Sequence, residues 1–172
     1  MRFLKSFKYA YRGIVYCINN ERNMRIHTVI AAYVLALSFF YPMTPVRYAV
    51  LFLTFALVFM AELFNTVAEE LSDMAAASFN PVVRIIKDMA SGAVLVGAVF
   101  AVCVGVCLFW QPGVLWGVLL FFVQRPAAAV LLAAVTAFCI VYIVLGPLGI
   151  RDFIRQERNK NKGERRIGSE QK

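Results

Sequence analysis

The sequence predicts an all-α integral membrane protein with an N-terminal amphipathic surface helix, three core transmembrane helices and a fourth, C-terminal span. The first observation is composition. Of the 172 residues, 61% are hydrophobic and the mean hydropathy is +0.70, whereas soluble domains are roughly 45–50% apolar. The second is that the apolar residues form long runs, which Pro, Gly and charged residues separate. The third is that Lys and Arg gather towards the two ends of the chain.

Residues 1–20 are expected to form a helix on the cytoplasmic membrane surface. Lys5, Lys8 and Arg12 lie off an apolar stripe that repeats at helical spacing. An amphipathic helix of this kind lies in the membrane interface. Packing against a neighbouring helix is compatible with the same pattern. The stripe consists of Phe3, Phe7, Ala10, Ile14 and Ile18.

Four later apolar runs are the expected membrane spans. A crossing helix needs about 20 residues, so the first run is short, and a further run inside the outer loop at 111–126 is too short to cross. The spans are expected at 26–41, 46–73, 82–110 and 127–145, the last ending at Gly146-Pro147.

The chain divides into three parts on this basis. Residues 1–110 form a membrane domain that includes the surface helix, and residues 111–150 form the outer loop and the fourth span. Residues 151–172 are basic and almost free of apolar residues, so we expect a disordered cytoplasmic tail.

The basic residues also set the expected orientation. Only Arg47 and Arg125 fall in the two loops assigned to the outer side. Cytoplasmic loops carry an excess of Lys and Arg, and an even number of crossings places both termini on one side. The N and C termini are therefore expected in the cytoplasm, and the net charge of +8 reflects topology and not nucleic-acid binding.

A polar stripe interrupts the end of the second span. Glu62, Asn65, Glu69 and Asp73 are three, four and four residues apart, which places them on one helix face. Glu62 and Glu69 would be stacked ~10 Å apart along the axis. Carboxylates at the end of an apolar segment are costly and mark functional sites.

The chemistry expected at this face is metal-dependent phosphate transfer. Mg²⁺ prefers oxygen ligands and takes one or two carboxylates plus substrate phosphates, while a lysine binds phosphate as a point charge. The sequence contains no Walker-type phosphate loop. Six acids are expected on the cytoplasmic side, namely Glu21, Glu62, Glu69, Glu70, Asp73 and Asp88.

Structural interpretations of the same residues stay open. Glu69 and Asp73 are also placed to pair with Arg84 or Lys87 in a solvated salt-bridge face. Glu70 lies off the stripe and is expected in solvent. His27, at the head of the first span, is expected to anchor the helix at the interface.

The combined motifs resemble the prokaryotic diacylglycerol kinase family of small trimeric membrane enzymes, which includes undecaprenol kinases. The resemblance covers roughly residues 1–110 and rests on Glu62-Leu63-Phe64-Asn65-Thr66 followed by Glu69 and Asp73, and on Lys87-Asp88-Met89-Ala90-Ser91-Gly92. Upstream, Tyr9, Gly13, Asn20, Glu21 and Arg25 occur at the family's spacing from Glu62.

The resemblance implies a role for each matched residue. It implies that Glu62 is the general base for the lipid hydroxyl, and that Glu21 and Glu69 are the Mg²⁺ ligands. It implies ATP as co-substrate, bound by residues that include Lys87 on phosphate. The implied nucleotide-binding residues are Arg2, Tyr9, Glu21, Glu69, Lys87 and Asp88, and the implied supporting residues are Asn65, Asp73, Ser91 and Arg25.

Function and substrate follow as expectations from the same resemblance. We expect an ATP- and Mg²⁺-dependent lipid kinase, a homotrimer in the bacterial cytoplasmic membrane that binds no nucleic acid. The run Glu21-Arg22-Asn23-Met24-Arg25-Ile26-His27 favours undecaprenol over diacylglycerol as the lipid alcohol. The rival classes are a non-enzymatic helical membrane adaptor and a transporter, the latter disfavoured because the last two spans carry no charged residue beyond Asp88.

Overall fold

The computed structural model describes the backbone of residues 2–75 and 80–170, and the side chains of residues 3–75, 80–153 and 155. The described residues are almost entirely helical, which confirms the all-α prediction. The helices are α1 (Arg2–Asn20), α2 (Arg22–Ser38), α3 (Pro45–Ala75), α4 (Pro81–Phe109), α5 (Pro112–Gln124) and α6 (Pro126–Glu170).

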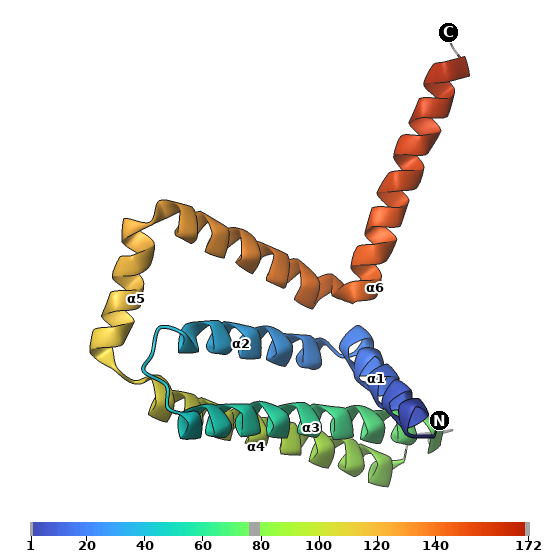
Figure 1. Cartoon of the computed structure of the whole chain (residues 1–172). Helices are drawn as coiled ribbons and strands as arrows, with labels where there is room; N and C mark the ends of the chain where they lie inside the picture. Colours follow the sequence, from blue (N-terminus) through green and yellow to red (C-terminus); the bar gives the residue numbers. More distant parts are fainter. Residues whose placement is uncertain (1, 76–79, 171–172) are drawn as a thin grey trace.

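Three helices, α2, α3 and α4, lie side by side and form the body of the molecule (Figure 1). The closest packing is between α3 and α4. Asn80 begins α4 by accepting a hydrogen bond from the Val82 amide at 2.9 Å, with Pro81 in the first turn. Such a cap satisfies one of the free amides of the first turn, so the start of α4 is fixed locally.

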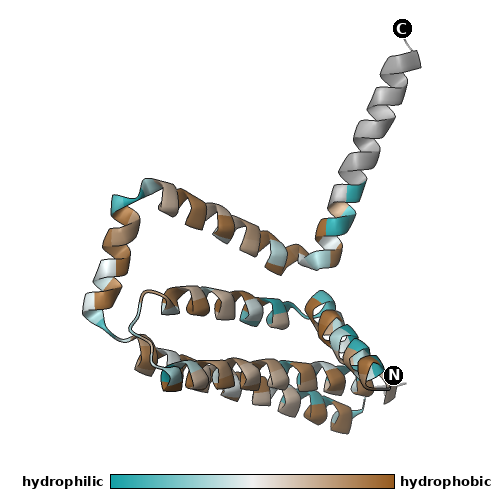
Figure 2. Cartoon of the chain, viewed as in Figure 1, coloured by the Kyte–Doolittle hydropathy of each residue, from teal (hydrophilic) through white to brown (hydrophobic). Residues whose placement is uncertain are grey.

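Helices α1 and α5 lie at opposite ends of this body (Figure 1). Hydrophilic residues gather on α1 and at the neighbouring end of α2 (Figure 2), whereas α5 is apolar. An amphipathic helix at one end and an apolar helix too short to cross at the other agree with the predicted interfacial positions.

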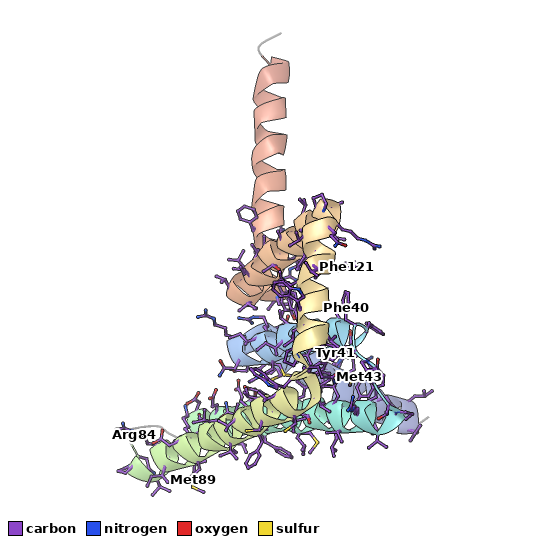
Figure 3. All side chains as sticks on the ribbon, turned by 90° about the vertical axis from the view of Figure 1, so that its left-hand side faces the viewer. Phe40, Tyr41, Met43, Arg84, Met89 and Phe121 are labelled. Atoms are coloured by element: carbon purple, nitrogen blue, oxygen red, sulfur yellow. The ribbon has the colours of Figure 1, made fainter. Side chains whose placement is uncertain are left out.

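An apolar cluster joins the helices at the α5 end. Tyr41 and Phe109 pack edge to face with ring centroids 5.0 Å apart, and the Tyr41 hydroxyl donates to the Phe109 carbonyl at 3.0 Å. Leu51 and Leu108 complete the buried cluster. Next to it, the ring of Phe40 meets Phe121 of α5 at 5.3 Å, and the two side chains are labelled together in Figure 3.

Three of the described helices are long and apolar enough to cross a membrane, namely Pro45–Ala75, Pro81–Phe109 and Pro126–Phe153. Helix α2 has 17 residues, which at ~1.5 Å per residue is ~26 Å and slightly less than a typical ~30 Å hydrocarbon core. Four crossings and cytoplasmic termini stay predictions.

Helix α6 consists of two helical segments that meet at a sharp bend (Figure 1). Gly146 has the non-helical φ of 67° and ψ of 171°, so the apolar segment from Pro126 breaks at Gly146-Pro147, where the span was predicted to end. The backbone of residues 151–170 is helical, and the disorder of this tail in solution stays a prediction. Arg, Lys, Gln and Glu are good helix formers, and a low apolar content alone does not oppose a local helix.

Candidate active site

Glu62 is the most deeply buried charged side chain among the described residues, with 0% exposure. His27 of α2 places its Nε2 atom 3.1 Å from Glu62 Oε1. This is ion-pair distance without hydrogen-bond alignment, and neither Glu62 oxygen has a hydrogen-bond partner among the described residues. A buried carboxylate without hydrogen bonds is costly to maintain, which marks Glu62 as a functional group.

A second carboxylate comes close from the junction of α1 and α2. Glu21 is half-buried, and its pKa is raised, first by burial and then by the negative charges of Glu69 and Glu62, against an opposing effect of Arg25. The three glutamates therefore interact electrostatically within one chain. Helix α1, which precedes Glu21, packs on α3 of the same chain.

Asn65 connects the stripe to α4. Its side-chain amide donates to Glu69 Oε1 at 2.9 Å, and the Ser91 hydroxyl donates to Asn65 Oδ1 at 3.4 Å. The contact between Asn65 and Glu69 agrees with the predicted shared face. Through this chain of bonds, α4 orients the Glu69 carboxylate.

The remaining predicted residues lie further from Glu62. Lys87 of α4 forms an ion pair with Asp73 of α3, which is the pairing that the salt-bridge interpretation anticipated. Tyr9 and Asp88 are exposed. The side chain of Arg2 lies outside the described residues, as does most of the loop between α3 and α4.

The carboxylates of Glu21 and Glu69 suit Mg²⁺, which takes few protein ligands, better than a metal ion whose ligands all come from the protein. Among the described side chains, no group of three or more His, Cys, Asp or Glu residues is arranged to hold a metal ion. Glu21 and Glu69 nevertheless repel each other enough to affect the pKa of Glu21. Two carboxylates with room for substrate oxygens match the usual Mg²⁺ site.

Sequence reasoning missed two partners of this region. His27, expected as an interfacial anchor, contacts Glu62 instead. Tyr16 donates from its hydroxyl to Glu70 Oε1 at 2.6 Å, and this bond raises the pKa of Tyr16. Glu70 is exposed, as predicted, but it is not simply solvated. No spacing signal connects these pairs, because each is formed by helices that only the fold brings together.

An apolar groove runs along the helices near Glu62. It has a volume of about 230 Å³, and His27, which contacts Glu62, lines it. Val58 and Phe59 line it on α3, one turn before Glu62. The other lining residues come from α2, α3 and α4 and are all apolar except Thr54. The buried carboxylate therefore lies close to an apolar surface.

Comparison with known proteins agrees with this arrangement. Residues 8–109 match the family model of prokaryotic diacylglycerol kinase. A Synechocystis protein named diacylglycerol kinase is 40% identical over 110 residues, which are 63% of this chain and 63% of that protein. A Bacillus subtilis protein named undecaprenol kinase is 35% identical over 108 residues, 63% of this chain and 88% of that protein.

The match thus spans less than two thirds of the Synechocystis protein. Helices α5 and α6 lie beyond the segment that the family model matches. The matched segment contains the buried Glu62, the carboxylates Glu21 and Glu69, and the groove. The chain belongs to the prokaryotic diacylglycerol kinase family, a family of membrane lipid kinases.

Proposed function

We propose that the protein transfers the γ-phosphoryl group of ATP to the hydroxyl of a membrane lipid alcohol. The observation that carries this proposal is Glu62, which is fully buried beside an apolar groove and has no hydrogen-bond partner for either oxygen among the described residues. A base for a lipid hydroxyl needs a carboxylate oxygen that is free to accept a proton, and this supports Glu62 in the role.

In the proposed reaction, Glu62 accepts the proton of the lipid hydroxyl. The hydroxyl oxygen forms a bond to the γ-phosphorus, and the bond from that phosphorus to the bridging oxygen of ADP breaks, so that ADP leaves. Mg²⁺ held by Glu21 and Glu69 would neutralise charge that develops on the phosphate oxygens. Asn65 keeps the Glu69 carboxylate oriented.

The nucleotide is proposed to approach from the α1 end, where the polar residues gather (Figure 2). Lys87 would then exchange its bond to Asp73 for a phosphate oxygen, since a lysine ammonium binds phosphate as a point charge. Arg2, Tyr9 and Asp88 are proposed as further nucleotide contacts, on the strength of the family resemblance. This end would face the cytoplasm, where ATP is available.

The lipid is proposed to lie with its hydroxyl at Glu62 and its apolar chain in the groove. The lining on α3 extends from Leu51 to Phe59, a length of ~12 Å. The run at 21–27 leads us to favour undecaprenol, which the name of the Bacillus subtilis relative also contains. Diacylglycerol is the alternative that the name of the Synechocystis relative suggests.

Kinetics with purified protein test both the reaction and the substrate. Undecaprenol and diacylglycerol are compared side by side in detergent with ATP and Mg²⁺, and we expect a higher kcat/KM for undecaprenol. A preference for diacylglycerol would reverse the substrate assignment. Absence of phospholipid product with either alcohol would favour the non-enzymatic adaptor.

The assembly is proposed to be a homotrimer in the bacterial cytoplasmic membrane, as the family resemblance implies. Because Glu21, Glu62 and Glu69 interact within one chain, mixing Glu62→Gln with Glu21→Gln subunits should not restore activity. Restored activity in confirmed mixed oligomers would show that the site is shared between subunits.

A further inference from the structure

Arg25 connects three helices through backbone carbonyls. The residue is buried, with 7% exposure. Its Nη1 atom donates to the carbonyls of Ile18 at 3.1 Å and Asn19 at 2.9 Å, in the last turn of α1. Its Nε atom donates to the carbonyl of Ile143 in α6 at 3.1 Å.

Each of these carbonyls lacks its ordinary helical partner for a reason visible in the sequence. Ile18 and Asn19 are among the last residues of α1, and the final carbonyls of a helix have no amide to accept from. The carbonyl of Ile143 would accept from residue 147, which is proline and has no N–H. Arg25 supplies donors where the chain leaves acceptors free.

Gly146 provides the space for this guanidinium. Its φ of 67° is in the left-handed region that glycine adopts readily. A Cβ atom at this position would lie 3.0 Å from Arg25 Nη1 and 3.2 Å from Arg25 Cζ. The kink of α6 therefore leaves space for the Arg25 side chain. It lies where α1, α2 and the bend of α6 meet (Figure 1).

Arg25 is one turn from Glu21. The Glu21 carbonyl accepts from the Arg25 amide at 3.4 Å, and Glu21 occupies the extended position between α1 and α2. The Arg25 charge also lowers the pKa of Glu21, against the larger effects of burial and of Glu69 and Glu62. The junction that carries Glu21 is thus held by three Arg25 bonds, of which two end in α1 and one ends in α6.

We propose that helix α6 is a positioning element of the site. The Gly146-Pro147 kink holds the Arg25 guanidinium and thereby fixes Glu21 in the position that binds Mg²⁺. Helix α6 lies outside the segment that matches the family model, so this role belongs to the added part of the chain. The inference rests on the proposed function through Glu21.

The test measures binding of Mg²⁺ with a non-hydrolysable ATP analogue to the full-length protein in detergent, by calorimetry. Gly146→Ala and Arg25→Lys should each weaken Mg²⁺ affinity by about tenfold, the lower end for loss of groups that orient metal ligands. The matched control is Gly117→Ala in α5, where an added Cβ meets nothing within 4 Å, and it should bind as the wild type does.

A double variant gives a second readout. If Arg25 and Gly146 act as one unit, the combined change should weaken binding little more than either single change. Pro147→Ala covers the case in which the glycine variant fails to fold. Its restored amide competes with Arg25 for the Ile143 carbonyl without adding bulk beside the guanidinium, and it should lower Mg²⁺ affinity in the same direction.

Two outcomes would overturn the inference. One is unchanged Mg²⁺ affinity in Arg25→Lys and Pro147→Ala. The other is a loss of melting temperature in both without a change in affinity, because this is the behaviour of a purely structural contact. Failure of the proposed function looks different, since wild-type protein would then bind no Mg²⁺-nucleotide, or Glu21→Gln would bind it as well as wild type.

Discussion

The two ends of the α2–α4 body bury different kinds of side chain. At the α5 end, Tyr41, Leu51, Leu108 and Phe109 form an apolar cluster. The polar atoms buried there are satisfied, since the Tyr41 hydroxyl donates to Phe109 and the Ser38 hydroxyl to Leu35. At the α1 end the buried side chains are of both kinds, since the polar Arg25, Glu62, Asn65 and Thr66 lie among them with Cys17 and Met24. Neither Glu62 oxygen has a hydrogen-bond partner among the described residues.

The difference separates the part that holds the helices together from the part in which we propose that the reaction takes place. Consistent packing and satisfied polar groups specify a fold, and violations of that consistency concentrate at functional sites. The helices α3 and α4 pass through both ends, so they can tolerate an unfavourable carboxylate at one end because packing at the other end is favourable. Changes at the two ends should therefore affect different measurements.

The largest effect is expected for Glu62→Gln. Glutamine keeps the size of the side chain but cannot accept the proton, so kcat should fall by at least ~100-fold, the lower end for loss of a general base. Turnover of the folded variant in detergent measures this. Glu70→Gln on the same helix is the control, because the amide can still accept from Tyr16. Near-native kcat for Glu62→Gln would remove the base assignment.

A smaller effect is expected for Glu69→Gln. The change removes a charged oxygen ligand, so the Mg²⁺ concentration for half-maximal activity should rise by at least about tenfold, and excess Mg²⁺ should restore part of the turnover. The increase in melting temperature on adding Mg²⁺ should also be smaller than in wild type. Equal Mg²⁺ responses in the two proteins would contradict the ligand assignment.

The smallest effect is expected at the apolar end. Tyr41→Phe leaves the ring but removes the bond to the Phe109 carbonyl, at a cost of about 1 kcal/mol of stability. The melting temperature should fall by roughly 2–4 °C, while kcat and the Mg²⁺ requirement stay at wild-type values. A variant with unchanged melting temperature but reduced kcat would erase the distinction between the two ends.

Much of the fold was predictable from the sequence because lipid imposes simple rules on it. The long runs at 46–73 and 82–110 correspond closely to α3 and α4, since an apolar segment in a bilayer must form its own hydrogen bonds. The apolar segment from Pro126 breaks at Gly146-Pro147, where the span was predicted to end. The sequence did not indicate that Arg25 satisfies the Ile143 carbonyl, which Pro147 leaves without an amide partner.

The site was predictable only along one helix. The spacing of Glu62, Asn65 and Glu69 predicted a shared face, and the Asn65–Glu69 bond agrees with it. Contacts between different helices are not marked by any regular residue spacing in the sequence. The positions of His27 against Glu62 and of Glu21 near Glu69 follow from how α1 and α2 pack on α3, which no local pattern encodes.

The packing of α6 along α2 has a consequence for how the protein meets the bilayer. Helix α2 is short, and a short helix facing lipid would thin the membrane around it or leave its polar ends in hydrocarbon, the problem of hydrophobic mismatch. Helix α6 covers one side of α2, with Tyr33 and Thr136 joined by a hydrogen bond of 2.7 Å. On that side, lipid meets the 28-residue apolar stretch Pro126–Phe153 in place of α2. Helix α2 then does not need to match the thickness of the membrane. Its length can instead be the one that places Arg25 and His27 at the site.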